Sequence, residues 1–496
     1  MEEKKIYILN PDYTLRKDQN RVILTNRIAD PTIKDFIGFV HPLYAIILSF
    51  FDGEKNLGQV LKATSELLRK DQGFISNIIT PLLENKEGVH FHYDNYHFSF
   101  PEKLLVNKNS DTIPKKYNLE NFFIPRLEMA LESRRMNFPL DIFFMINTRC
   151  VTNCVYCYAD RSKRMDCEIS LERLKELIRE AKALDMRSFD ITGGELFLYK
   201  HWEKFLAELL DNAFNPYIST KCPLEPKTIK RLKELGIKRI QVSIDSIIKD
   251  ELMNLLNVNE DYCDRLLATL NNLDENGFEI YTNTQLTSIN TNHVDTLIEG
   301  LLNFKNIKRI NIGAAGFSLY KGENDFHKYK AVLSDIKRIE SYVHEMKEKY
   351  RGSVSINFSG YVERAKILNT DKEEKKKNFQ ERSSCSGNFY SLFILPDGKV
   401  TICEELYWHP AFIIGDLTKQ SIMETWNSKR ALELYNISRD MVKEESQCKT
   451  CNEFDQCHKY KGVCWKEILY AYGYENWDFP DPKCHCAPEP SREYYY

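Results

Sequence analysis

The stretch IFFMINTRCVTNCVYC, residues 142–157, joins a short apolar segment to a loop that holds three cysteines. The segment IFFMIN predicts a β-strand, because a brief apolar run is typical of a strand that is buried on both faces. From there to residue 316, short strand-like segments such as SFDIT, RIQVSID and EIYTNTQL alternate with longer helix-like segments. This alternation predicts an α/β fold in which parallel strands form a partial, TIM-like barrel of about six β/α units.

The barrel is expected over residues 140–318. In such barrels the catalytic groups lie at the carboxyl ends of the strands. The cysteine loop directly follows the first strand, so we expect it at that end.

The chain before the barrel predicts a small module over residues 1–103 and a linker over residues 104–139. The module begins with a hairpin over residues 14–26, which turns at Asp18-Gln19-Asn20. Apolar residues at three- and four-residue spacing then predict three helices, over residues 41–51, 56–68 and 74–85, before a pair of short strands around Asp94-Asn95. A hairpin, three helices and a β-wing are typical of a winged helix-turn-helix module.

The chain after the barrel predicts a helical bridge over residues 319–384 and a cysteine-rich unit over residues 385–496. A long charged helix is expected at residues 326–350, followed by a Lys/Glu run at residues 371–377 that is typical of a solvated face or linker. Eight of the 14 cysteines lie in the last unit.

The composition excludes several classes of protein. The chain has 69 Lys and Arg against 72 Asp and Glu, a net charge of −3, which gives no reason to expect nucleic acid or an anionic membrane as a partner. The longest apolar run, residues 43–51, is far too short for a membrane span, and the N-terminus lacks a signal-peptide core. We therefore expect a cytoplasmic protein, whose 14 cysteines are metal ligands rather than disulfides.

Cys150, Cys154 and Cys157 are the candidate catalytic ligands. Three thiolates can hold three irons of a [4Fe–4S] cluster and leave the fourth iron without a protein ligand. A structural zinc needs a fourth Cys or His nearby, and none occurs between Cys157 and Cys167, which disfavours zinc. The spacing, with an aromatic residue before the last cysteine, resembles the signature of the radical SAM superfamily.

That resemblance implies that S-adenosylmethionine (SAM) chelates the open iron through its methionine amine and carboxylate. An electron from the cluster, supplied by a donor such as flavodoxin or ferredoxin, then cleaves SAM to a 5′-deoxyadenosyl radical. The resemblance also implies cofactor contacts, by Glu195 to the methionine ammonium and by the end of the QVSIDS strand to the ribose or carboxylate. The expected cofactor-binding residues are Tyr156, Gly193, Gly194, Glu195, Ser243 and Asp245.

Two features leave part of that assignment open. Ser243 and Asp245 could instead cap a strand-to-helix turn. Many relatives also carry a downstream arginine that pairs with the SAM carboxylate, but here the segment after the QVSIDS strand has none before Arg265.

The C-terminal cysteines, with the text FILPDGKVTIC and IGDLTKQSIMETWNS, resemble the SPASM domain, which houses auxiliary iron–sulfur clusters. Six residues separate Cys457 from Cys464, where the family usually has three. The resemblance assigns Cys448, Cys451, Cys457 and Cys484 to one cluster and Cys385, Cys403 and Cys464 to another, which makes three [4Fe–4S] clusters in all. Structural zinc sites are the alternative, because zinc accepts similar thiolates.

The fourth ligand of the cluster at Cys385, Cys403 and Cys464 is open. Either Cys486 supplies it, or one iron stays accessible to a substrate thiolate.

The N-terminal module is poorly suited to DNA. Its third helix, residues 74–85, has no Lys or Arg, and residues 1–100 carry 12 basic and 13 acidic side chains. The module resembles the PqqD-like recognition element that binds the leader of a ribosomally made precursor peptide. That resemblance implies strand addition of the leader at a hairpin edge near residues 22–25, next to the third helix.

Together these resemblances predict a radical SAM maturase that forms thioether links between a Cys sulfur and a carbon of a precursor peptide. The alternatives are another SPASM-type reaction, namely carbon–carbon crosslinking or side-chain oxidation, and a zinc-binding winged-helix regulator without catalysis.

Overall fold

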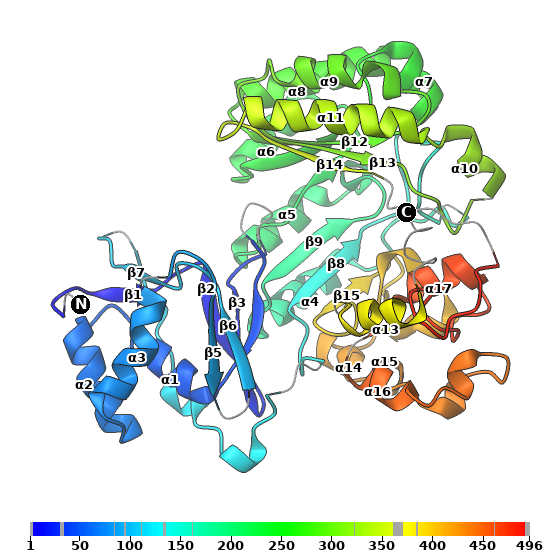
Figure 1. Cartoon of the computed structure of the whole chain (residues 1–496). Coiled ribbons are helices and arrows are strands. Elements are labelled where there is room, and N and C mark those ends of the chain that lie inside the picture. The colour runs from blue at the N-terminus through cyan, green and yellow to red at the C-terminus, as the bar shows by residue number, and fades with distance from the viewer. Residues whose placement is uncertain are drawn as a thin grey trace. The chain divides into compact units, whose positions relative to one another are not determined.

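The computed structural model describes residues 3–29, 34–83, 85–93, 96–110, 112–131, 135–160, 162–321, 323–360, 371–382, 385–460 and 462–491. The chain divides into two compact units, Met1–Phe138 and Pro139–Tyr496 (Figure 1). Among the described residues, no helix has the length and apolar character needed to cross a membrane.

The first unit combines short antiparallel strands with three helices. Its strands are β1 (Tyr7–Leu9), β2 (Tyr13–Asp18), β3 (Arg21–Asn26), β4 (Ile37–Val40), β5 (Val89–Tyr93), β6 (Tyr96–Phe100) and β7 (Leu105–Asn107), and its helices are α1 (Pro42–Ser49), α2 (Leu57–Leu68) and α3 (Gln72–Leu83). Strands β2, β3 and β4 form one sheet, β5 pairs with β6, and β1 pairs with β7. The expected hairpin and three helices are present, whereas the Asp94-Asn95 turn lies outside the described residues.

Two expectations for this unit are wrong. Residues 104–139 are not simply a linker, because β7 pairs with β1 and Phe122 is 2% exposed within the unit's apolar core. Residues 22–25 are not a free hairpin edge, because β3 is the central strand and pairs with β2 on one side and β4 on the other. The sequence of a hairpin does not reveal that a third strand, further along the chain, closes its second edge.

The second unit contains two five-stranded sheets. One has the order β10-β11-β12-β13-β14, all parallel, and the other the order β17-β16-β15-β8-β9, in which β15, β8 and β9 are parallel. The strands are β8 (Asp141–Met145), β9 (Ser188–Thr192), β10 (Ser219–Thr220), β11 (Arg239–Ser243), β12 (Glu279–Leu286), β13 (Ile307–Ala314), β14 (Ser355–Ser359), β15 (Ser391–Ile394), β16 (Lys399–Thr401) and β17 (Ile413–Asp416).

Helices surround these sheets and share one large apolar core with them. They are α4 (Leu171–Ala183), α5 (Trp202–Asp211), α6 (Pro226–Glu234), α7 (Lys249–Leu256), α8 (Asp261–Glu275), α9 (Val294–Leu301), α10 (Glu323–Tyr329), α11 (Leu333–Lys349), α13 (Lys372–Gln380), α14 (Ile422–Trp426), α15 (Lys429–Tyr435), α16 (Phe454–Tyr460) and α17 (Trp465–Tyr472). Ser170 caps α4, as its sequence predicts, by accepting a hydrogen bond from the Arg173 amide.

The structure differs from the expected boundaries at residues 318 and 384. The expected helical bridge contains β14, which extends the parallel sheet beyond β13, and the long helix is divided into α10 and α11 by extended backbone at Val332. On the other side β15, in the cysteine-rich part, pairs with β8. Strands β8 to β14 and the C-terminal part therefore belong to one compact unit.

Candidate active site and cysteine clusters

The three cysteines of the first loop line one cavity of about 480 Å³ at the carboxyl ends of parallel strands of the second unit. The cavity is lined by Cys150, Thr152, Cys154, Tyr156, Cys157, Tyr158, Gly193, Gly194, Glu195, Ser219, Thr220, Lys221, Gln241, Ser243, Asn283, Gln285, Ala315, Gly316, Phe317, Glu405, Lys466 and Tyr470. Its volume is typical of a site for a small molecule or cofactor. The structure thus brings together every predicted catalytic and cofactor-binding residue except Asp245.

The glycine pair allows the loop after β9 to pack directly on the segment that precedes Cys150. The Gly194 amide donates to the Asn147 carbonyl at 2.7 Å, and the Glu195 amide donates to the Arg149 carbonyl at 2.6 Å. A Cβ atom on Gly194 would lie 2.2 Å from that Arg149 oxygen, and Gly193 has a φ of +103°. The glycines are therefore required by this backbone contact as well as by the cavity that they line.

Glu195 places a carboxylate in the wall of this cavity. The residue is 3% exposed, and its oxygens accept hydrogen bonds from the Thr220 hydroxyl at 2.7 Å and the Lys221 amide at 3.1 Å. Burial raises the pKa of Glu195 to about 7, although these hydrogen bonds act in the opposite direction. A cationic group in the cavity would favour the ionised carboxylate.

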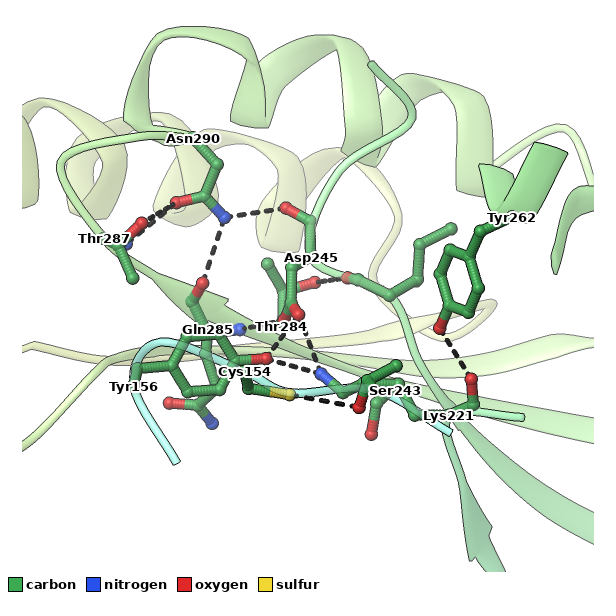
Figure 2. A network of polar contacts seen from close by, with 12 residues as sticks. Cys154, Tyr156, Lys221, Ser243, Asp245, Tyr262, Thr284, Gln285, Thr287 and Asn290 are labelled. Carbon is green, nitrogen blue, oxygen red and sulfur yellow. Dashed lines mark hydrogen bonds and ion pairs between the residues drawn. The ribbon is translucent and has the colours of Figure 1, made fainter. Parts of the chain in front are cut away.

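Lys221, Tyr156 and Asp245 form a network beside the cysteine loop (Figure 2). Lys221 Nζ lies 2.7 Å from Asp245 Oδ2 and 2.5 Å from the Tyr156 hydroxyl, which donates to the same Asp245 oxygen. Burial lowers the pKa of the Lys221 ammonium, but Asp245 and the thiols of Cys154 and Cys157 outweigh burial and raise it. The ammonium is therefore held in its charged form.

Asp245 lies behind the cavity wall and is not among the residues that line the cavity. Its side chain has no exposed surface, and Oδ1 accepts the backbone amide of Gln285 at 2.9 Å. The Asn290 amide group donates to the Asp245 carbonyl at 2.7 Å, which ties the end of β11 to the end of β12 (Figure 2). Ser243 does line the cavity, whereas Arg265 is not among the lining residues and pairs with Asp261 at 3.5 Å.

Sequence reasoning missed Lys221, Glu405, Lys466 and Tyr470, which also line this cavity. Glu405 follows Cys403, and its carboxylate contacts Lys466 Nζ at 2.7 Å and the Tyr470 hydroxyl at 2.9 Å. The C-terminal part therefore contributes a polar wall to the cavity. The position of Glu405, two residues after the predicted ligand Cys403, was the only sequence signal for it.

A second cavity, also of about 480 Å³, is lined by five cysteines, namely Cys448, Cys451, Cys457, Cys484 and Cys486. The sulfurs of Cys484 and Cys486 and a ring nitrogen of His485 lie within 4.8 Å of one another. Arg382 donates a hydrogen bond to the Cys457 sulfur at 3.6 Å. Such a set of soft donors suits an iron–sulfur cluster or zinc.

Cys486 therefore lies with the Cys448 group. The short turn that holds Cys484 and Cys486 places both on the same cavity, and the Cys486 amide donates to the Cys484 sulfur at 3.4 Å. This position speaks against Cys486 as the fourth ligand of the Cys385, Cys403 and Cys464 group.

Cys385, Cys403 and Cys464 form the third group. Burial raises the pKa of Cys403, and the nearby thiols of Cys385 and Cys464 add to that effect. Burial also raises the pKa of Cys464 to about 12, and Cys385 is again among its neighbours. These mutual effects on the pKa are consistent with three thiols that serve a single cluster.

Two models of known protein families match separate parts of the chain. Residues 145–301 match the family model of the radical SAM superfamily, and residues 385–452 match the SPASM iron–sulfur cluster-binding domain. A probable GTP 3′,8-cyclase from Methanosarcina mazei is 28% identical over 32% of this chain and 50% of that protein. A second, from Archaeoglobus fulgidus, is 32% identical over 21% of this chain and 34% of that protein. The chain thus spans half or less of the length of these relatives.

The fold is similar to that of Streptococcus suis SuiB. The crystal structure of SuiB bound to precursor peptide SuiA has a TM-score of 0.63 and 14% identity, covering 96% of this chain and 98% of that one. The structure of SuiB bound to S-adenosylmethionine has a TM-score of 0.61 and 16% identity, covering 96% and 99%. These findings assign a radical SAM domain to residues 145–301 and an iron–sulfur cluster-binding SPASM domain to residues 385–452.

Proposed function

We propose that this protein is a radical SAM enzyme that modifies a ribosomally made precursor peptide by linking a Cys sulfur to a carbon of another residue. The observation that carries the proposal is the first cavity. Three thiols, the buried carboxylate of Glu195 and the polar side chains of Glu405, Lys466 and Tyr470 all line it. The fold similarity to SuiB, which was crystallised with a precursor peptide, supports a peptide as the substrate.

In this proposal Cys150, Cys154 and Cys157 hold the radical-generating cluster. Glu195 receives the methionine ammonium of SAM, and Ser243 contacts the cofactor from the end of β11. When bound, SAM and the cluster supply the radical that removes a hydrogen atom from the peptide. The chain itself orients SAM, positions the peptide carbon and keeps water from the cavity.

The two remaining groups of cysteines are proposed to hold auxiliary [4Fe–4S] clusters. Cys448, Cys451, Cys457 and Cys484 supply four thiolates for one cluster. Cys385, Cys403 and Cys464 supply three for the other, so that a thiolate of the substrate can bind its remaining iron. A cluster held by Cys385, Cys403 and Cys464 would supply an acceptor for the electron that thioether formation releases.

The first unit is proposed to bind the leader of the peptide by strand addition. Since β3 is paired on both sides, the leader must use another strand. The Leu15 amide of β2 donates to the Tyr117 hydroxyl at 3.2 Å, so that edge is partly occupied. We therefore place the added strand at β4 (Ile37–Val40) rather than at residues 22–25.

Two measurements test this function. Anaerobically reconstituted protein should release 5′-deoxyadenosine from SAM under a strong reductant, and Cys150→Ala should abolish that release. Co-expression with a short Cys-containing peptide encoded beside the gene should lower the peptide mass by two hydrogens for each link. A colourless protein that contains only zinc would refute the enzyme, and a different mass change would point to carbon–carbon crosslinking or side-chain oxidation.

A further inference from the structure

Lys221 lies in the wall of the first cavity, directly after the two-residue strand β10. Its side chain is 17% exposed, and it neighbours Asp245, whose side chain is fully buried. Its pairing with Asp245 offsets the cost of placing an ammonium here. Because this ion pair lies at the edge of a ligand cavity, a ligand in the cavity can also contact the ammonium.

An ammonium group has three protons to donate. Within the described chain, Lys221 Nζ has two hydrogen-bond acceptors, the Tyr156 hydroxyl and Asp245 Oδ2. One proton therefore remains for a group that occupies the cavity. An anionic acceptor would gain a charge-assisted hydrogen bond, which is stronger than a neutral one.

Lys221 is also adjacent to the carboxylate proposed to hold the ammonium of SAM. The backbone amide of Lys221 donates to Glu195 Oε2 at 3.1 Å, and Thr220 donates to the other Glu195 oxygen. The ammonium and carboxylate of methionine are attached to the same carbon atom. A cation that receives the carboxylate must therefore line the same cavity as Glu195, as Lys221 does, and the Lys221 backbone lies directly beside the Glu195 carboxylate.

The other basic side chains fit this role less well. Lys466 is the second cationic side chain among the residues that line the cavity. Its Nζ contacts the carboxylate of Glu405 at 2.7 Å, in the part of the wall that the C-terminal residues form. Arg265 pairs with Asp261 and does not line the cavity.

We propose that Lys221 is the residue that binds the carboxylate of SAM, in the place of a downstream arginine. This inference rests on the proposed function, because it presumes that SAM binds with its amino-acid end at Glu195. Asp245 and Tyr156 then act as positioning residues, which hold the ammonium toward the cavity.

The test compares two ligands that differ in the amino-acid end. SAM carries the carboxylate, whereas 5′-methylthioadenosine keeps the adenosine and sulfur without it. Lys221→Met should raise the Kd for SAM about ten- to a hundredfold and leave the Kd for methylthioadenosine within about twofold, as measured by calorimetry on reconstituted protein. Lys221→Arg should restore most of the affinity for SAM, and Lys227→Met, an exposed lysine that pairs with Glu225, serves as the matched control.

Because Lys221→Met leaves Asp245 buried without its partner, the double variant Lys221→Met/Asp245→Asn is measured beside it. It should show the same selective loss for SAM. An equal loss of both ligands, or an unchanged Kd for SAM, would overturn the inference and leave Lys221 as a support of the cysteine loop. If wild-type protein shows no SAM-induced change in the electron paramagnetic resonance signal of its reduced cluster, the proposed function fails instead.

Discussion

The raised pKa of Glu195 predicts how the stability of the ligand-free protein depends on pH. The pKa is about 7 in the folded chain against an ordinary value of 4.5, so above pH 4.5 the unfolded chain releases this proton while the folded chain keeps it. The free energy of unfolding therefore falls as the pH rises from about 4.5 to about 7, and the loss is complete above that range. Glu195→Gln removes this dependence, since its amide does not titrate.

The size of the effect follows from the shift. Between pH 5 and pH 8, the free energy of unfolding of Glu195→Gln should rise relative to that of the wild type by roughly 2 to 3 kcal/mol, at 1.36 kcal/mol for each pKa unit. For a unit of this size, that corresponds to a relative gain in Tm of about 3 °C. Changes in hydrogen bonding caused by the amide are similar at both pH values and largely cancel in this comparison.

The assay is thermal unfolding of iron-free, reduced protein followed by tryptophan fluorescence. All five tryptophans lie after residue 139, so the signal reports on the second unit. Glu275→Gln, which makes the same replacement at an exposed position of α8, is the matched control. A Tm difference between wild type and Glu195→Gln that is the same at pH 5 and pH 8 would refute the claim that burial perturbs this carboxyl.

Three other variants test the packing around the sites. Gly194→Ala should lower both the Tm and the iron content, because its Cβ would lie 2.2 Å from a backbone oxygen of the cysteine loop. The guanidinium of Arg187 lies 2.7 Å from the buried carboxylate of Asp141. Because Arg187→Leu leaves that carboxylate without its ion-pair partner, the variant should lower the free energy of unfolding, measured by urea unfolding, by about 3 kcal/mol or more. Cys457→Ala removes one of the four proposed ligands of that cavity and should remove up to about four irons per chain in a colorimetric assay. Cys486→Ala should remove none, because it leaves all four proposed ligands, Cys448, Cys451, Cys457 and Cys484, in place.

The sequence predicted the parts of the site that depend on neighbouring residues. The cysteine loop follows a strand, and the glycine pair and Glu195 follow the next one, so their meeting at one end of the sheet is a consequence of parallel pairing. Patterns among consecutive residues also predicted the hairpin over residues 14–26 and the three helices that follow it. In each case a few consecutive residues carried the whole signal.

The sequence did not predict what depends on pairing between distant segments. Strand β14 is five residues long and follows a charged helix, so nothing near it indicates that it pairs with β13. Likewise, the pairing of β4 with β3 closes an edge that the hairpin alone leaves open. Cys486 follows Cys484 by two residues, but their spacing does not indicate which cysteine group they join. The turn that holds both residues places them on the cavity of Cys448, Cys451 and Cys457.

Lys221 illustrates why the charges of a site are harder to read than its ligands. Lys221 belongs to no recognisable sequence motif. Its role depends on its ion pair with Asp245, which is 24 residues away in the chain and has a fully buried side chain. Asp245 keeps the ammonium charged, whereas the neighbouring Glu195 has only hydroxyl and amide donors, so burial raises its pKa. A ligand that carries an ammonium beside a carboxylate would balance both groups at once. We therefore expect the charge pattern of this wall to favour the amino-acid end of a zwitterion over a simple anion or cation.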